Sequence, residues 1–248
     1  MRSFGFAAAS ALIMASLSAC SVSSDGDSTP GLAASGSGNT RSFAATDFSA
    51  IELRGSDDVD VRVGSGFSVR AEGPSEELDK LKIERDGTTL KIGRRSANGI
   101  SWGGSKRNVT VYVTMPRIAK ASLAGSGNLT IDRAEGQEFS GELAGSGNLS
   151  IAALSVQSAK FEIAGSGNTK AAGTAKQLSV ELAGSGDVDA AALKAEGAEV
   201  SIAGSGSVRA EVNGPAQINI LGSGDVDLGK GAECTTSKMG SGEVRCGN

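Results

Sequence analysis

Residues 123–131 read Leu-Ala-Gly-Ser-Gly-Asn-Leu-Thr-Ile, and this short pattern recurs along the second half of the chain. In each copy a Gly-Ser-Gly triplet stands between two short apolar segments, and the first glycines of successive triplets lie 18–20 residues apart. Self-similarity at a fixed period is the signature of a repeat protein, so this stretch decides the fold. The copies begin at Leu123, Leu143, Ile163, Leu182, Ile202, Ile220 and Met239.

Both flanks of the triplet are predicted to be short strands. Leu178, Val180 and Leu182 alternate with polar residues before one triplet, and Val188 and Ala190 alternate after it. A period of two is typical of a strand with one buried side. The glycines are expected to allow a positive φ or a close backbone approach at a sharp corner. Two all-β arrangements remain: hairpins that turn at Gly-Ser-Gly, or a solenoid in which each repeat is one coil.

The outward position three residues after each second glycine distinguishes the two arrangements. In a solenoid, opposite charges stack on neighbouring coils from Lys170 onward, at the ~4.8 Å spacing of paired strands. Hairpins would instead place Glu181 opposite Asp189, and facing like charges are destabilising. The sequence therefore predicts an all-β parallel β-helix (solenoid) with coils of about 20 residues. The column reads Thr130, Ser150, Lys170, Asp189, Arg209, Asp227 and Arg245.

Two inward columns are expected to fill the narrow interior. Each gives one apolar side chain per coil, and stacking turns these side chains into ladders. The first ladder is Leu123, Leu143, Ile163, Leu182, Ile202, Ile220 and Met239. The second ladder is Leu129, Leu149, Thr169, Val188, Val208, Val226 and Val244.

Two further outward columns bear on function. Glu142, Glu162 and Glu181 would stack as three acids, which costs stability unless cations, a basic partner or solvent screening offsets the repulsion. We treat this stripe as a candidate binding surface, with a simple solvated face as the alternative. The other column is predicted to be structural, because stacked amides bond one another along a solenoid. It contains Asn128, Asn148, Asn168 and Asp187.

Residues 46–120 also contain alternating apolar runs, but their turns are irregular. We expect wider early coils of the same solenoid here, followed by regular repeats over residues 121–248. Residues 97–108 are expected to be a polar loop that carries Trp102, the only tryptophan. Trp102 is a candidate anchor for a partner, because large exposed rings often dominate interfaces. The alternative is that Trp102 caps the open end of the apolar core.

The N-terminus resembles a bacterial lipoprotein signal peptide. Arg2 is followed by an apolar run, and Leu17-Ser18-Ala19 precedes Cys20. The resemblance implies that residues 1–19 are a signal peptide, that cleavage precedes Cys20, and that this cysteine is acylated and held in a membrane. Residues 20–45 are expected to form the lipidated N-terminus and a flexible tether, because Ser, Gly, Asp, Thr and Ala dominate there.

Composition removes several classes of chemistry. The chain has no His, which excludes Ser-His-Asp and Cys-His catalysis and His-ligated metals. Its net charge is −4, without a basic cluster interleaved with aromatics, so no nucleic acid partner is expected. The Gly-Ser-Gly triplets lack the Gly-Lys-Ser/Thr of a phosphate loop, and the aspartates after them are offset from those of calcium β-rolls. We therefore expect no cofactor and no metal.

Two cysteines remain once Cys20 is acylated. Cys234 and Cys246 form an even pair near the end of the last coil, in an exported and oxidising setting. A bridge between them would pin that coil where no further coil covers the core. We therefore predict a disulfide between these two residues.

Several segments together resemble a known family. They are residues 48–63, the turn at 86–90, the strand at 109–116 and the recurrent Gly-Ser-Gly. Over about residues 41–246 the chain resembles the head GIN domain family, described as putative autotransporter adhesins. The resemblance implies a right-handed parallel β-helix on an exported bacterial protein, often a lipoprotein. It supplies no catalytic residues.

These features favour a cell-envelope lipoprotein with a single β-helix domain over residues 46–248. We expect a non-catalytic surface for binding, adhesion or structure, held at the outer membrane by the N-terminal lipid and facing an envelope or surface macromolecule. The alternative is a polysaccharide-active enzyme of the lyase type, because pectate-lyase-type enzymes are also β-helical. Such an enzyme would need a divalent cation and would release sugar fragments.

Overall fold

The computed structural model describes residues 31–95 and 109–247, and apart from one helical turn every regular element in these ranges is a strand. The first elements are β1 (Ala34–Ser35), β2 (Thr40–Phe43), β3 (Ala50–Gly55), β4 (Asp58–Val63), β5 (Ser68–Glu72), α1 (Ser75–Leu78), β6 (Leu81–Asp86), β7 (Thr89–Arg94) and β8 (Thr110–Met115). The later ones are β9 (Lys120–Gly125), β10 (Asn128–Ile131), β11 (Ala134–Gly145), β12 (Asn148–Gly165), β13 (Asn168–Gly184), β14 (Val188–Gly204), β15 (Val208–Val212), β16 (Gly214–Gly222), β17 (Val226–Asp227), β18 (Ala232–Gly240) and β19 (Val244–Arg245).

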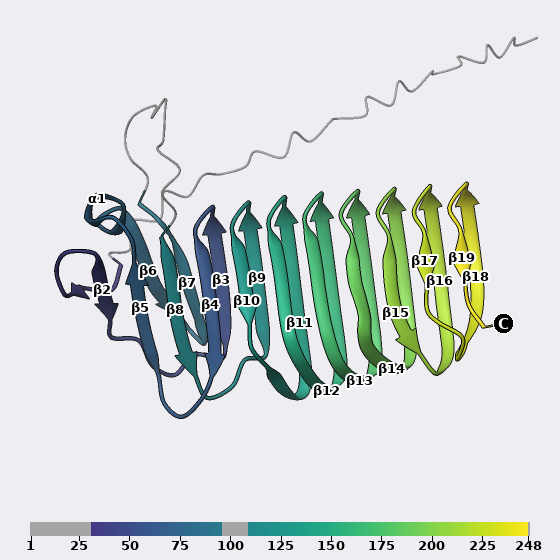
Figure 1. The fold of residues 1–248 in the computed structure, drawn as a ribbon, viewed down its shortest axis with the longest axis horizontal. Coiled ribbons are helices and arrows are strands. Elements are labelled where there is room, and N and C mark those ends of the chain that lie inside the picture. Colours follow the sequence, from purple (N-terminus) through teal and green to yellow (C-terminus); the bar gives the residue numbers. More distant parts are fainter. Residues whose placement is uncertain (1–30, 96–108, 248) are drawn as a thin grey trace, which may run out of the picture. The chain divides into compact units, whose positions relative to one another are not determined.

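From β9 onward the chain winds as a parallel β-solenoid, which confirms the predicted fold class (Figure 1). β11 pairs in parallel with β9 on one side and with β12 on the other, and the triplets coincide, as at Gly145 and Gly165. Glu181 pairs with Glu162 and Ser201 on neighbouring coils. The hairpin alternative, which would have set Glu181 against Asp189, is therefore wrong.

Each complete coil has three faces. Along β12 the buried positions alternate within short runs, and the alternation slips twice, after Ile151 and after Val156. The register against β13 also shifts between Ile151 and Leu154, where the strand bends. Together with the Gly-Ser-Gly corner, these slips turn the chain three times and keep apolar side chains inside on every face.

Both glycines of a triplet lack room for a Cβ, and the first also has a backbone angle that favours glycine. Gly145 has a φ of 124°, in the range that L side chains rarely adopt. Gly147 is needed for space, because a Cβ there would lie 2.3 Å from the carbonyl oxygen of Gly127 on the preceding coil. The amides of Ser146 and Gly147 both donate to the carbonyl oxygen of Gly125, at 3.0 Å. The corner therefore binds each coil to the one before it.

The inward ladders are buried as predicted, with two exceptions in the last coil, where Val244 is only partly buried and Met239 does not belong to the ladder. Leu143, Ile163 and their equivalents as far as Ile220 are buried, but Met239 faces outward and is 73% exposed. Met239 pairs with Leu221, while Lys238 pairs with Ile220. The inward position lies two residues before the first glycine, and Met239 lies one residue before it, so its assignment to the core was wrong.

Polar groups close the interior at this end. Lys238 occupies the inward column of the last coil, and its Nζ donates to the carbonyl oxygen of Gly242 at 2.6 Å. Thr236 follows Ile218 in the neighbouring inward column. A polar side chain in these positions suits a coil that no described strand covers, because its inner surface remains in contact with water.

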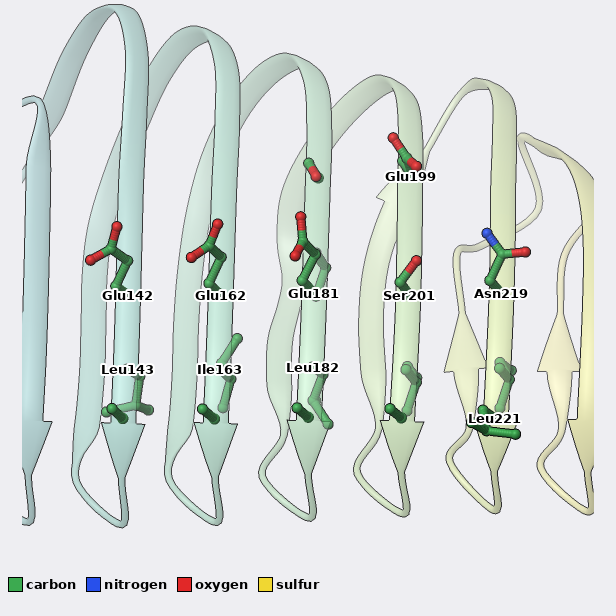
Figure 2. Close-up of a pocket in the computed structure, with 18 of the residues that line it drawn as sticks. Glu142, Leu143, Glu162, Ile163, Glu181, Leu182, Glu199, Ser201, Asn219 and Leu221 are labelled. Atoms are coloured by element: carbon green, nitrogen blue, oxygen red, sulfur yellow. The ribbon is translucent and has the colours of Figure 1, made fainter. Parts of the chain in front are cut away.

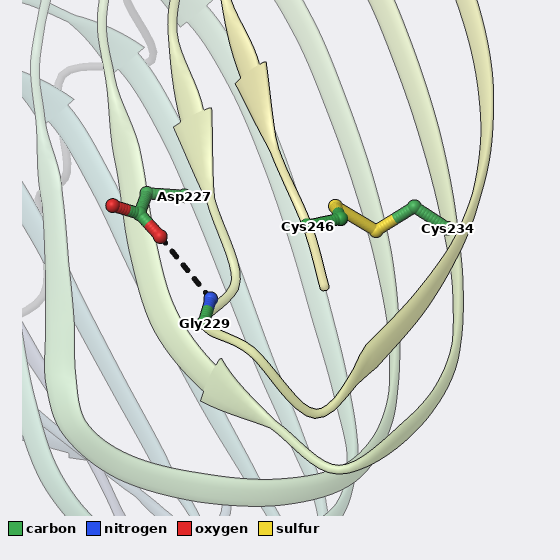
Figure 3. Close-up of a disulfide and its surroundings, with 4 residues drawn as sticks. All are labelled: Asp227, Gly229, Cys234 and Cys246. Carbon is green, nitrogen blue, oxygen red and sulfur yellow. Dashed lines mark hydrogen bonds between the residues drawn. A yellow bond between two sulfur atoms is a disulfide. The ribbon is translucent and has the colours of Figure 1, made fainter. Parts of the chain in front are cut away.

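A disulfide crosses the same coil (Figure 3). It joins Cys234 to Cys246, with a Cα–Cα distance of 6.1 Å. Cys234 is in register with the buried Ala216, and both cysteines pack against the apolar core. Nearby, the Asp227 carboxylate accepts a hydrogen bond from the amide of Gly229 at 3.1 Å and fixes the turn. The covalent bridge therefore ties the final strand segments together over the end of the core.

The N-terminal region contains the expected early coils together with antiparallel strands. β3 and β4 stack in parallel with β9 and β10 on one side and with β7 and β8 on the other, so the parallel stack extends as far as β7 and β8. β5, in contrast, is antiparallel to both β2 and β8, and β6 is antiparallel to β7 through a turn at Gly87. The region therefore continues the parallel stack and adds antiparallel strands that the repeat pattern did not predict.

Residues 31–45 also belong to this region, although their composition predicted a tether. β2 pairs with β5, Phe43 and Ala45 are buried, and Leu32 packs against the core. These few apolar residues find partners about 30 residues further along the chain, which local composition cannot reveal. The tether prediction is therefore wrong for residues 31–45.

A buried carboxylate holds this end together. Asp57 is fully buried and accepts hydrogen bonds from Nε and Nη2 of Arg94, at 2.8 and 2.6 Å, and from the amide of Val109, at 3.1 Å. The bonds to Asp57 raise the pKa of the Arg94 guanidinium above its ordinary value. Asp57 thus joins the end of β7 to the start of β8.

Candidate binding face

The predicted acidic stripe lies on the outer side of the long strands. Glu142, Glu162 and Glu181 are in register on β11, β12 and β13, and Ser201 and Asn219 continue the row (Figure 2). The stacking of the three acids is confirmed. We call this row and the apolar row beside it, described below, the candidate binding face.

Lysines of the chain itself offset part of the repulsion. Lys120 lies 2.5 Å from the Glu142 carboxylate, and Lys160 contacts both Glu162 and Glu181, the latter at 3.2 Å. Hydrogen bonds to these two glutamates raise the pKa of Lys160. Lys160 is thus shared by two glutamates. The stripe therefore keeps an excess of negative charge toward β13.

An apolar row runs beside the acids. The residue just before each triplet points outward and is alanine on five coils, and it becomes Leu221 and then Met239 on the last two. Leu221 is 59% exposed and Met239 is 73% exposed, and they are the exposed large hydrophobic residues of the described chain. A shallow groove of about 850 Å³ follows the two rows. The alanines are Ala124, Ala144, Ala164, Ala183 and Ala203.

The predicted charge column forms a ladder on another face of the solenoid. Lys170 is opposite Asp189 with 3.9 Å between their charged groups, and Asp189 is in register with Arg209. Asp227 and Arg245 continue the alternation on the last coils. Opposite charges therefore alternate along this column, in contrast to the acidic stripe.

The asparagine column is a hydrogen-bonded ladder. The amide of Asn128 donates to the Asp58 carboxylate at 2.7 Å, and the amide of Asn148 donates to Asn128 at 2.8 Å. Asn168 donates in turn to Asn148 at 3.3 Å and accepts from the backbone amide of Asp187. The donors all point toward the preceding coil, so the column stabilises the stack, as its sequence predicted.

Only some of the site residues predicted from the sequence fall within the described part of the chain. Cys20 and Trp102 lie outside the described residues, while the three glutamates share one face. Sequence reasoning missed Leu221 and the true orientation of Met239, although a signal was present. Both break the column of alanines that precedes the triplets, and a large apolar residue on an outward column is unusual.

Neither a metal site nor a membrane-spanning helix is found in the described part of the chain. In residues 31–95 and 109–247, no three His, Cys, Asp or Glu side chains gather in a way that could hold a metal ion. The same ranges contain no helix long and apolar enough to cross a membrane. What the face offers is a rigid pair of acidic and apolar rows.

Solved structures of other proteins share this fold. A putative adhesin from Bacteroides fragilis NCTC 9343 matches with a TM-score of 0.75, at 20% identity over 84% of this chain and 95% of that chain. A putative lipid binding protein from Parabacteroides distasonis ATCC 8503 matches with a TM-score of 0.65, at 24% identity over the same shares. A putative adhesin from Parabacteroides merdae ATCC 43184 gives 0.59 at 17% identity, again over 84% and 95%. No curated protein matches this chain.

The family comparison agrees with these structures and with the repeat pattern. The model of one family matches residues 47–232, from the first solenoid strands to the start of β18. The chain therefore belongs to the family described as putative auto-transporter adhesin, head GIN domain.

Proposed function

We propose that this protein is a lipid-anchored, non-catalytic binding protein of the bacterial cell envelope, which holds a surface macromolecule on its solenoid. The observation that supports this most is the candidate binding face. Its acidic and apolar rows are fixed by strand register over several coils, so the surface needs little ordering when a partner binds. Membership of a family described as adhesins is consistent with this role.

Anchoring follows from the N-terminal sequence. Cys20 would be the first residue of the mature chain and would carry the lipid that holds the protein in an envelope membrane, which we propose is the outer membrane. Because the fold already includes residue 31, the tether would span only residues 21–30.

The anchor can be tested by metabolic labelling with palmitate. Cys20→Ser should abolish incorporation of the label, because the change removes the sulfur that would be acylated. Cys234→Ser is the matched control, since it removes another cysteine and should leave the labelling unchanged. A Cys20→Ser protein that still takes up the label would refute lipidation at this residue.

Binding without turnover is tested separately. Beads coated with the purified chain should retain bacterial or host surface material, and incubation of the chain with polysaccharides, with and without calcium, should release no sugar fragments. Calcium-dependent release of fragments would favour the lyase alternative. Trp102 remains a second proposed contact: its change to Ala should weaken retention without lowering the melting temperature if it is an anchor.

A further inference from the structure

The strongest unexplained feature is the C-terminal part of the candidate binding face. Leu221 and Met239 stand exposed side by side, in register on β16 and β18, and continue the row of alanines. Two adjacent large apolar side chains on an otherwise small-residue row have no role in the core. Such pairs on an exposed surface are typical of contact sites.

Negative charge lies on the coils that precede this pair. Lys160 is shared by Glu162 and Glu181, and Glu199 on β14 has no ion-pair partner within the described part of the chain. Both Glu181 and Glu199 line the groove, as do Leu221 and Met239 (Figure 2 labels the first three). The groove therefore carries acids on its earlier coils and large apolar groups on its last two coils, where Lys238 also lines it.

The net charge also differs between the two halves of the chain after residue 30. Residues 31–133 contain 15 Lys and Arg against 12 Asp and Glu, whereas residues 134–248 contain 8 against 14. The acidic surplus thus falls on the coils that form the groove. Fields of this kind steer oppositely charged partners and repel anionic ones, such as phosphate headgroups or nucleic acid.

We propose that this groove docks a basic amphipathic helix of a partner protein, with apolar side chains on Leu221, Met239 and the alanine row and with Lys or Arg against Glu181 and Glu199. The inference rests on the proposed binding function and names its partner class. A helix that lays its apolar stripe in a shallow groove is a common mode of recognition. The alanines let its backbone approach closely.

The dimensions fit such a helix. Five coil steps of about 4.8 Å separate Glu142 from Ser237, or roughly 24 Å along the solenoid axis. A helix of about 18 residues is roughly 27 Å long. One helix of ordinary length would therefore span the groove from its acidic start to Met239.

The test uses the purified full-length chain and a fluorescent helical peptide of about 18 residues built from Leu and Lys, whose affinity is measured by anisotropy. Two peptides of equal length serve as controls: one with Glu for Lys, and one with Ser for Leu. Only the Leu–Lys peptide should bind tightly, and its affinity should fall with added salt. Equal binding of the Leu–Glu peptide would overturn the proposal.

Two double variants locate the site. Leu221→Ser with Met239→Ser, and Glu181→Gln with Glu199→Gln, should each weaken binding by about tenfold or more, and the second pair should also reduce the salt dependence. The matched control is Glu135→Gln with Glu211→Gln, which neutralises two exposed acids outside the groove and should change affinity by less than about twofold. Unchanged affinity in both groove variants would refute the site.

Vesicles of phosphatidylglycerol distinguish a membrane from a protein partner. The unmodified chain and Leu221→Ser with Met239→Ser should bind them equally, since only the N-terminal lipid would attach the chain to a vesicle. Vesicle binding that depends on Leu221 and Met239 would overturn the helix proposal in favour of a lipid surface. Retention of surface material by Leu221→Ser/Met239→Ser beads separates the two proposals. If the variant beads still retain surface material, the groove proposal is overturned while the binding function stands. If the unmodified chain binds the peptide but retains no surface material, the binding function alone is refuted.

Discussion

Thr169 shows how one residue can depart from the repeat. It occupies the inward column between Leu149 and Val188, it is buried, and its hydroxyl has no hydrogen-bond partner within the described residues. A buried, unpaired hydroxyl costs about 1–3 kcal/mol. We predict that Thr169→Val, which keeps the side-chain shape, raises the free energy of unfolding by about 1 kcal/mol, measured by urea denaturation.

The reverse change is the matched control for this prediction. Val188→Thr places a hydroxyl in the same ladder on the next coil and should lower the free energy of unfolding by about the same amount. If Thr169→Val proved less stable than the unmodified chain, the hydroxyl would have a partner that the geometry does not show.

At the scale of single strands, the charge ladder allows the register between neighbouring coils to be tested. Asp189 on β14 is in register with Arg209 on β15, but each also faces a second charge, Lys170 and Asp227 respectively. Reversing both charges would therefore create two new repulsions. Neutralisation is cleaner: in a cycle of Asp189→Asn and Arg209→Gln, we predict a favourable coupling of about 0.5 kcal/mol that high salt reduces.

A distant pair within the same ladder gives the control. Asp189 and Arg245 lie three coils apart in the ladder, so the cycle of Asp189→Asn with Arg245→Gln should show no coupling. Zero coupling for Asp189 with Arg209 as well would mean that solvent screens the ladder completely.

The last coil depends on its disulfide more than the inner coils do. With Cys234 and Cys246 both changed to Ser, we predict faster hydrogen exchange in β18 and β19 and unchanged exchange in β12 and β13, because each coil contacts only its neighbours. Mass spectrometry without reductant should find no free thiol at either cysteine in the unmodified chain. Two alkylatable thiols, or faster exchange throughout the solenoid, would contradict this account.

Elements with a short repeat were predictable from sequence, and elements with distant partners were not. The strands beside Gly-Ser-Gly, the charge ladder and the glutamate stripe follow from one period of about 20 residues. β2 and the β6–β7 hairpin lack that period, and β2 owes its place to pairing with β5. Met239 was misplaced because a shift of one residue in the alignment moves a strand side chain to the opposite face.

On the scale of the whole molecule, the repeat converts the residue type at one position into a continuous surface feature. A residue type that recurs at one position of the repeat becomes a row along the axis, as the alanines and glutamates do on the candidate binding face. The sequence predicted the acidic row from this rule. It did not reveal the docking groove. The outward direction of Leu221 and the lack of an ion-pair partner for Glu199 within the described chain can be seen only in the structure.

Stacking also determines how the solenoid unfolds. Ile202 is buried between Leu182 and Ile220, so Ile202→Ala removes contacts with the coils on both sides. We predict a loss of about 2–5 kcal/mol and a broader urea transition, because a weakened central interface lets the two ends unfold separately. The control is Val244→Ala in the last coil, which is only partly buried and meets a described neighbour on one side. It should cost less and leave the steepness of the transition unchanged, and an equal cost for both variants would show that stability does not accumulate coil by coil.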